Sequence, residues 1–330
     1  MSNQKILLSV CVPTYNRPAE LRRFLEILAP QITGRVEIVI GDDGDEDGVL
    51  VTKSILNNFP AANITYFKNP YGRGAVQNII AVTERASGYY IWWFGDDDTM
   101  TSGAIERTLK IIEEYPEIDF IWSNYVSFPQ VSRLAIDLKE SRFFRDSNEI
   151  LETVASHLGL ISTNIFKRGL VSPHALLDNA LVNTGNFNLY IVMQILAKSK
   201  ASYYMHEPGV INYPQTTGDC SYNPFQTFAI DYYVIVKNFE KSFKKGSIRK
   251  MIGENFKHVW RAVLVAKARG DTPAWVPPNV AKTLFKYYWS YLGYWIAFPF
   301  LLMPQRWVKI FYSLFKFLRA KVKRNMLLKT

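Results

Sequence analysis

Short apolar runs alternate with amphipathic segments along residues 1–125 of the chain. The apolar runs predict strands over Leu7–Val12, Val36–Ile40, Ile64–Phe67, Tyr89–Phe94 and Phe120–Tyr125. The amphipathic segments predict helices over Pro18–Leu28, Val49–Asn58, Ala75–Ala86 and Gly103–Glu114. Strands that alternate with helices favour an α/β fold with a mainly parallel sheet that helices flank on both faces.

Polar side chains directly follow three of the predicted strands. Pro13-Thr14 follows the first strand, Asp42-Asp43 follows the second, and Asp96-Asp97-Asp98 follows the strand Tyr89–Phe94. Ligands of open α/β sheets bind beyond the carboxyl ends of the strands. We therefore expect the three polar clusters to share one rim of the sheet.

The pattern after residue 125 is less regular, with loops expected around Pro129, Pro173 and Tyr213–Pro224. Two helices are predicted further along the chain, over Phe228–Phe243 and Ile248–Ala268. The second half of the chain is therefore predicted to be richer in helix than the first.

The C-terminal segment is aromatic, then basic. Tyr287–Met303 is almost uncharged but is broken by Gly293 and Pro299, and it is at the short edge of what spans a bilayer. Trp307–Lys323 combines an apolar stripe with Lys and Arg, the composition of a helix lying in the plane of an anionic membrane surface. A helical cap packed on the rest of the protein is the alternative.

The net charge of +10 is unevenly distributed. Residues 241–330 carry 19 Lys and Arg against Glu254 and Asp271, a net charge of +17, whereas residues 1–240 have a net charge of −7. Such a basic segment indicates an anionic partner, unless it is simply a solvated face. Apolar aromatics at helical spacing favour lipid over nucleic acid, so we expect a membrane surface and no nucleic acid.

Neither cysteine usage nor the N-terminus indicates export. Cys11 lies in an apolar run, and Cys220 lies in a predicted loop, so a reducing compartment is the simpler expectation. The apolar stretch Ile6–Val12 is short and lacks a small-residue cleavage pattern. We expect a peripheral protein at the cytoplasmic face of the membrane.

The cluster Asp96-Asp97-Asp98 would bring three negative charges together after a buried strand. Their repulsion is costly unless a cation or hydrogen-bond donors compensate it. Oxygen ligands on a short loop suit Mg²⁺ or Mn²⁺, with substrate phosphates completing the shell. Taken alone, the cluster could also be a solvated acidic turn.

The motifs in combination are more specific than any one of them. The stretches Leu8–Arg17, Val39–Gly44 with Asp47-Gly48, Asn69–Asn78, Ala86–Ile91 and Gly95–Asp98 resemble, in order and spacing, motifs of family 2 glycosyltransferases with the GT-A fold. The layout is most similar to bacterial enzymes of O-antigen or capsule assembly, such as the abequosyltransferase-like branch. The resemblance implies a GT-A domain over residues 1–225, with a nucleotide-binding half of about 1–125 and an acceptor half of about 126–225. Residues 226–330 are then a helical C-terminal region with a membrane-binding tail.

The resemblance also implies roles for individual residues. Those expected to bind the nucleotide-sugar are Pro13, Thr14, Tyr15, Arg17, Asp42, Asp43, Arg73, Asn78, Asp96 and Asp97. Of these, Asp43 would hydrogen-bond the base, and Arg73 or Asn78 would contact the ribose-phosphate part. Asp98, with Asp96, would bind Mn²⁺ or Mg²⁺ on the diphosphate.

The sequence departs from the family at the catalytic base. An acidic residue is expected about 90 positions after the metal motif, but Asn183–Leu189 contains no carboxylate. Asp178 is the nearest candidate for deprotonating the acceptor hydroxyl. Glu207 and Asp219 are further candidates.

The expected function is transfer of a sugar from a UDP-, CDP-, GDP- or dTDP-linked donor to a lipid-linked or polysaccharide acceptor in cell-surface glycan synthesis. A polyprenyl-phosphate glycosyltransferase is an alternative. A sugar nucleotidyltransferase is disfavoured because no Gly-rich phosphate loop follows the first strand. A non-enzymatic membrane or nucleic-acid binder is the remaining alternative.

Overall fold

The computed structural model describes residues 5–314 except positions 61, 70–73, 174–179, 215–222 and 270–274. Its strands are β1 (Leu8–Thr14), β2 (Val36–Asp42), β3 (Ile64–Lys68), β4 (Tyr90–Trp93), β5 (Thr99–Met100), β6 (Phe120–Ser127), β7 (Gln130–Leu134), β8 (Arg142–Phe144), β9 (Asn164–Lys167) and β10 (Ser202–Asn212). Its α-helices are α1 (Pro18–Leu28), α2 (Glu46–Leu56), α3 (Ala75–Arg85), α4 (Ala104–Glu114), α5 (Ser147–Val154), α7 (Phe187–Lys198), α8 (Tyr232–Asn238), α9 (Lys245–Arg269), α10 (Val280–Tyr288) and α11 (Leu292–Leu302). Short helical turns also lie at Ala155–Gly159, Ile161–Thr163 and Gln226–Asp231.

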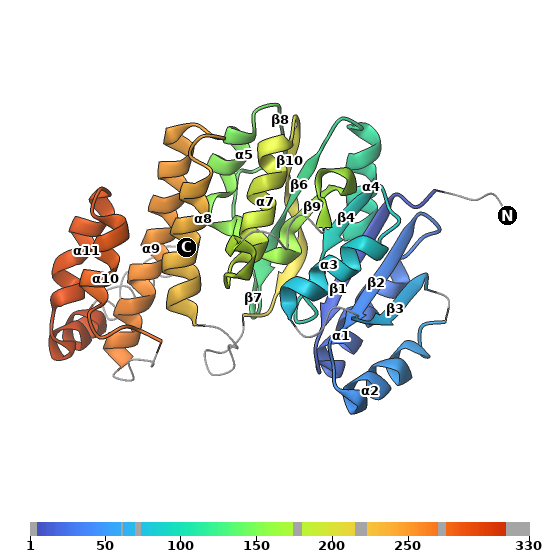
Figure 1. The fold of residues 1–330 in the computed structure, drawn as a ribbon, viewed down its shortest axis with the longest axis horizontal. Coiled ribbons are helices and arrows are strands. Elements are labelled where there is room, and N and C mark those ends of the chain that lie inside the picture. Colours follow the sequence, from blue (N-terminus) through green and yellow to red (C-terminus); the bar gives the residue numbers. More distant parts are fainter. Residues whose placement is uncertain are drawn as a thin grey trace, which may run out of the picture.

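The strands form one sheet in the order β3-β2-β1-β4-β9-β6-β10-β5, with β7 beside β6 and β8 beside β10 (Figure 1). Strands β3, β2, β1 and β4 are parallel, as predicted. In the other half β6 and β10 also pair in parallel, but other strands do not, so the prediction of a mainly parallel sheet is confirmed only in part. Strand β9 enters between β4 and β6 antiparallel to both, and β5, β7 and β8 also pair antiparallel, so the sheet is mixed.

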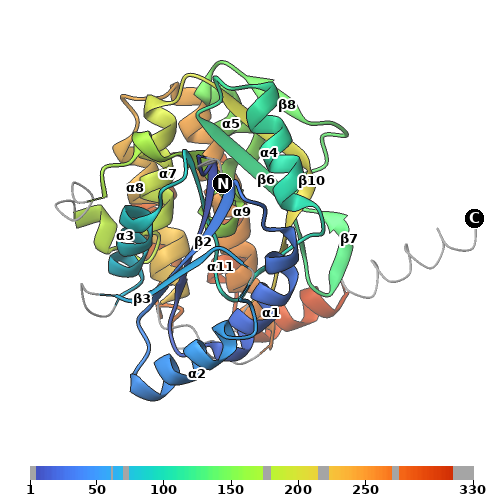
Figure 2. The same cartoon turned by 90° about the vertical axis from the view of Figure 1, so that its right-hand side faces the viewer.

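Alternate residues of β1 show how the sheet is covered. Leu8, Val10 and Val12 point into one apolar cluster with α1 and α4, whereas Cys11 points into the other with α3. Figure 2 shows α3, α7 and α8 on one side of the strands and α1 and α4 on the other. Helices therefore flank both faces of the sheet, as the alternating pattern predicted.

The apolar cluster on the α3 side continues from the sheet through α7, α8 and α9 to Tyr294 and Leu301 of α11. Helices α10 and α11 form the end of the molecule furthest from α2 and β3 (Figure 1). Residues 305–314 are helical as well. Within the described part of the chain, no helix is both long and apolar enough to cross a bilayer.

The N-terminal elements agree closely with the sequence pattern, and α1 has its predicted bounds. Helix α7 and the 11-residue strand β10 were not predicted. Leu189–Met193 of α7 are all buried, so the helix has no polar face and its sequence lacks a helical period. The tail beyond residue 314 lies outside the described residues.

Candidate active site

A cavity of about 1080 Å³ opens where β1, β2 and β4 end, and it extends to α9. The predicted site residues that line it are Pro13, Thr14, Tyr15, Arg17, Asp43, Asn78, Asp96, Asp97 and Asp98. Because the carboxyl ends of these parallel strands lie at the same edge of the sheet, three separate motifs meet at one place. The predicted shared rim is confirmed.

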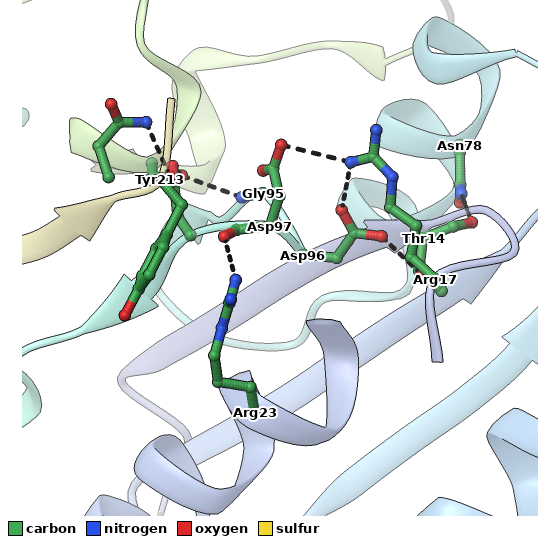
Figure 3. A network of polar contacts seen from close by, with 11 residues as sticks. Thr14, Arg17, Arg23, Asn78, Gly95, Asp96, Asp97 and Tyr213 are labelled. Atoms are coloured by element: carbon green, nitrogen blue, oxygen red, sulfur yellow. Dashed lines mark hydrogen bonds and ion pairs between the residues drawn. The ribbon is translucent and has the colours of Figure 1, made fainter. Parts of the chain in front are cut away.

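The ends of β1 and β4 are joined by hydrogen bonds. Thr14 Oγ1 donates to Asp96 Oδ2 at 2.7 Å. Arg17 Nη1 lies 3.1 Å from Asp96 Oδ1 and 3.3 Å from Asp97 Oδ2, bridging the two carboxylates (Figure 3). Arg23 Nη2 donates to the backbone oxygen of Asp97 at 2.5 Å. The two guanidinium groups thereby compensate part of the negative charge of the acidic loop.

The two carboxylates of the second acidic motif, Asp42 and Asp43, have different surroundings. Asp43 lines the cavity, and it accepts hydrogen bonds from Asn69 Nδ2 at 2.7 Å and from the Gly74 amide at 2.9 Å. Asp42 does not line this cavity; its carboxylate accepts the Gly44 amide and the Tyr66 hydroxyl and contributes to a smaller cavity of about 290 Å³. The structure thus brings Asp43 to the other predicted residues and places Asp42 beside them.

Asn78 ties helix α3 to the strand ends. Its Nδ2 donates to the backbone oxygens of Thr14, at 3.2 Å, and Gly41, at 2.9 Å. Its Oδ1 is buried and has no hydrogen-bond partner among the described residues. A Cβ on Gly41 would lie 2.2 Å from this Oδ1, so glycine is what allows α3 to approach β2 this closely. Asn78 therefore supports the cavity wall by holding α3 against the ends of β1 and β2.

Asp98 is held by residues that lie far from it in the sequence. Ser162 Oγ donates to its Oδ2 at 2.6 Å, while Asn212 Nδ2 and the Tyr213 amide donate to its Oδ1 at 2.9 and 3.1 Å. Ser162 Oγ also accepts the Gly95 amide at 3.0 Å. These partners fix the orientation of the carboxylate, and no local motif in the sequence signals them.

Burial makes ionisation of two carboxyl groups costly. Burial raises the pKa of Asp96 to about 6, although the charge of Arg17 and the Thr14 hydroxyl act in the opposite direction. Burial and then the charge of Asp97 raise the pKa of Asp98 to about 6, against the hydrogen bonds that it accepts. A cation placed at the cluster would relieve this cost.

The donor set suits a particular kind of metal site. The described residues contain no group of three or more His, Cys, Asp or Glu side chains that could hold a metal ion. Mg²⁺ commonly binds through one or two carboxylates and completes its shell with water and substrate phosphates. Among the described contacts, Asp98 Oδ2 accepts a single hydrogen bond, so it keeps a lone pair. The residues fit an ion that is bound together with a diphosphate.

Asp178, the predicted base, lies outside the described residues, as do Arg73 and Asp219. Glu207 pairs with Arg107 Nε at 3.2 Å and does not line the cavity. Asn186 and Asn188, from the segment that lacks a carboxylate, do line it. Sequence reasoning also missed Tyr125, His157 and His258, which belong to the same cavity but to no recognisable motif.

The structure resembles solved glycosyltransferases over almost its whole length. It superposes on Staphylococcus aureus TarS 1–349 in complex with UDP-GlcNAc with a TM-score of 0.61 at 14% identity, covering 93% of this chain and 92% of that chain. A mannosyltransferase from Pyrobaculum calidifontis, in complex with GDP-Man and Mn²⁺, gives a TM-score of 0.51 at 15% identity, covering 88% and 85%. At these identities the similarity establishes the fold, which is that of the GT-A glycosyltransferases.

Relatives with clearer sequence similarity are bacterial. The chain is 33% identical over 116 residues to an uncharacterized glycosyltransferase of Haemophilus influenzae, and the alignment covers 35% of this chain and 38% of the relative. It is 31% identical over 112 residues to the abequosyltransferase RfbV of Salmonella typhimurium (33% and 32% covered). It is 33% identical over 110 residues to a GalNAc(5)-diNAcBac-PP-undecaprenol β-1,3-glucosyltransferase of Campylobacter jejuni (32% and 35% covered). The aligned part is thus about a third of each relative's length.

The model of the family "Glycosyl transferase family 2" matches residues 9–171. This match contains β1 from Ser9 onward and the three polar strand ends that meet at the cavity. Together with the GT-A fold and the bacterial relatives, it identifies residues 9–171 of the chain as a family 2 glycosyltransferase domain.

Proposed function

We propose that this protein transfers a sugar from a nucleotide diphosphate-sugar to a hydroxyl group of a lipid-linked or polysaccharide acceptor in bacterial cell-surface glycan synthesis. The observation that carries the proposal is that Asp43 and the cluster Asp96–Asp98 line one cavity although they follow different strands. Tyr15, half exposed at the same cavity, offers a flat ring for a nucleobase. Asp43 supplies an acceptor for the base.

The other residues at the strand ends have distinct proposed roles in binding the donor. Pro13, Thr14 and Asn78 shape the nucleotide pocket, while Arg17 orients Asp96 and Asp97 toward the ribose or the sugar. Asp98, with Asp96, would hold Mn²⁺ or Mg²⁺ against the diphosphate. When bound, such an ion neutralises the charge that develops as the nucleoside diphosphate leaves.

The acceptor class is inferred from relatives and from the surface. Two relatives carry diphosphoundecaprenol or undecaprenol diphosphate in the names of their acceptors. An acceptor of this kind is anchored in a membrane, and one end of this molecule has the surface to meet it. Large apolar side chains that are at least 38% exposed occur on α10, α11 and residues 305–314: Phe285, Trp289, Leu292, Trp295, Ile296, Phe300, Leu302, Trp307, Ile310, Phe311 and Leu314.

Helix α11 shows why this surface needs a partner. Tyr294, Ala297 and Leu301 are buried against the body, but the rest of this uncharged helix is largely exposed. An apolar helix that is left uncovered marks a membrane or protein contact. Basic residues lie among the exposed aromatics, including Lys286, Arg306 and Lys309, and the sequence beyond them is strongly basic. We propose that this end docks on an anionic membrane, at the cytoplasmic face of the bacterial inner membrane.

A transfer assay tests the enzyme assignment. Membranes that contain lipid-linked glycan acceptors are incubated with purified protein, Mn²⁺ and radiolabelled UDP-, CDP-, GDP- or dTDP-sugars. We expect one nucleotide class to label the lipid fraction and the labelling to disappear with EDTA or in Asp98→Asn. The control is Asp137→Asn, which changes an exposed aspartate outside the cavity. Labelling that survives both EDTA and Asp98→Asn would refute the proposed role of Asp98.

A further inference from the structure

The wall of the cavity that comes from residues after 125 differs from the wall at the strand tips. It is formed by the turn Ala155–Gly159, the start of α7, one face of α9, the end of β10 with Tyr213, and the residues between 224 and 232 that line the cavity. Among the described residues of this wall there is no carboxylate; its titratable side chains are His157, His258, Tyr213 and Tyr232. Transfer of a sugar to a hydroxyl group requires a group that takes up the hydroxyl proton.

The carboxylates at the strand tips are occupied by other contacts. Asp96 accepts from Thr14 and Arg17, and Asp98 accepts from Ser162, Asn212 and Tyr213. These groups are engaged in holding one another and, in the proposed function, the donor. The proton acceptor is therefore sought on the opposite wall, where the imidazoles are the basic groups that the structure describes.

His157 is held in a defined orientation in that wall. Its Nδ1 lies 2.9 Å from the Tyr125 hydroxyl, and its ring meets those of Trp122 and His258 edge-on with centroids 6.3 Å away. The turn that carries it is fixed by Asn188, whose Nδ2 donates to the Gly159 oxygen. An aromatic frame and a single hydrogen bond on Nδ1 are what orient a catalytic imidazole.

The same segment connects His157 to the acidic cluster. Ser162, five residues further along, donates to Asp98 Oδ2 at 2.6 Å. Tyr125 interacts with both His157 and Asp98. Its hydroxyl oxygen lies 2.9 Å from His157 Nδ1. Burial and then the charge of Asp98 raise the pKa of Tyr125 to about 12, so its hydroxyl stays protonated. His157 therefore lines the cavity on a segment that continues to Ser162, the hydrogen-bond partner of Asp98.

We propose that His157 is the catalytic residue that accepts the proton of the acceptor hydroxyl, with Tyr125 as its positioning residue. This role rests on the proposed glycosyltransferase function. In the proposed tautomer Nδ1–H donates to the Tyr125 oxygen, so that the lone pair of Nε2 receives the proton as the acceptor O–H bond breaks. The acceptor oxygen bonds to the anomeric carbon, and the bond from that carbon to the diphosphate breaks, its electron pair leaving with the nucleoside diphosphate. A single displacement of this kind inverts the anomeric configuration.

The electrostatic surroundings keep His157 neutral before the reaction. Burial and then the nearby His258 lower the pKa of His157 to about 4, against the opposing charge of Glu254. At neutral pH the lone pair is therefore available. A bound diphosphate adds negative charge to the cavity, which raises the pKa of a nearby imidazole toward the operating pH and so improves it as a base.

The test compares His157→Gln with wild type in three measurements: donor affinity, kcat at saturating acceptor, and rescue by added imidazole. We expect unchanged donor affinity, a kcat lower by about 10²–10⁴-fold, and partial recovery of kcat with imidazole. His206→Gln serves as the matched control, because His206 packs beside Tyr204 and does not line the cavity. Tyr125→Phe should lower kcat less than His157→Gln and should not respond to imidazole.

Two results would overturn the inference. One is a wild-type kcat in His157→Gln together with loss of activity in Asp178→Asn or Asp219→Asn, which would place the base on one of those carboxylates. The other is loss of donor affinity in His157→Gln, which would show a structural role. A wild-type protein that binds no nucleotide-sugar and transfers no sugar would instead contradict the proposed function itself, so the two failures are distinguishable.

Discussion

Thr14 Oγ1 donates a 2.7 Å hydrogen bond to Asp96 Oδ2, and this bond joins two motifs that are 82 positions apart in the sequence. Thr14 ends β1, and Asp96 follows β4, which is the parallel neighbour of β1. The sheet therefore brings the two side chains together. Hydrogen bonds that hold side chains in place in this way reduce the cost of ordering a donor site when the substrate binds.

Removing Arg17 should move the pH dependence of activity. The charge of Arg17 lowers the pKa of Asp96, which burial has raised to about 6. Arg17→Met should raise this pKa further, so the acid limb of the kcat/KM profile should shift to higher pH. Arg22→Met, which changes an exposed arginine of α1, the helix that Arg17 precedes, is the control. An unchanged acid limb in Arg17→Met would show that Asp96 does not control it.

Asp98→Asn should stabilise the metal-free protein while it abolishes transfer. The pKa of Asp98 is raised from its usual 3.8 to about 6, so the folded state binds the proton more tightly than the unfolded state. Ionisation of Asp98 therefore lowers the free energy of unfolding as pH rises from about 4 to about 6. Above that range the cost is fully present, and it is absent below about pH 4.

The variant avoids this cost, and Asn can keep the hydrogen bonds from Asn212 and Tyr213 to Oδ1. In EDTA we expect the free energy of unfolding of Asp98→Asn to exceed that of wild type by on the order of 2 kcal/mol at pH 7.5. Urea unfolding from pH 3.5 to 8 measures it. A difference that does not shrink toward low pH would mean that Asp98 is not the group responsible.

Gly41→Ala tests the close approach of α3 to β2. The added Cβ would lie 2.2 Å from Asn78 Oδ1 and 2.8 Å from Val82 Cγ1. We expect a loss of about 1–3 kcal/mol in the free energy of unfolding and weaker donor binding, because Asn78 also holds the Thr14 backbone. Gly253→Ala in α9 has open space around the new methyl group and should stabilise by about 0.5–1 kcal/mol. Equal effects of the two substitutions in urea unfolding would contradict this packing.

Polar substitutions on α11 should weaken membrane binding. Leu292 and Trp295 are 75% and 50% exposed, so replacing both with Ser leaves the core intact. Co-sedimentation with vesicles that contain phosphatidylglycerol should fall relative to wild type, and wild-type binding should weaken with salt. Leu50→Ser on α2, where Leu50 is 64% exposed at the far end of the molecule, should bind like wild type. Equal loss of binding in both variants would reject α11 as the docking surface.

The sequence predicted the parts of this site that are local. Strand β1 and the loop at Thr14, and likewise β4 and Asp96–Asp98, are short apolar runs followed at once by polar residues, so periodicity and turn composition reveal them. Ser162 and Asn212, which hold Asp98, lie 64 and 114 positions away from it. Only the folded chain brings such residues together.

The mixed sheet was missed for a related reason. Strand β9 is four residues long, has only Ile165 and Phe166 as apolar residues, and pairs antiparallel with both β4 and β6. Nothing in so short a segment specifies its partners or direction. The buried helix α7 shows no polar face. His157 stands in a short turn without a motif around it, so its place in the cavity could be found only from the structure.

The most direct test of the central claim is the melting temperature of the protein with UDP, GDP, CDP and dTDP, each with and without Mn²⁺, for wild type and Asp98→Asn. A ligand that binds only the folded state raises the melting temperature. We predict that one of these nucleotides raises it for wild type, that Mn²⁺ enlarges the rise, and that Asp98→Asn loses the enlargement. If none of the four nucleotides raises the melting temperature, or if the Mn²⁺ effect persists in Asp98→Asn, the proposed diphosphate site at the acidic cluster is wrong.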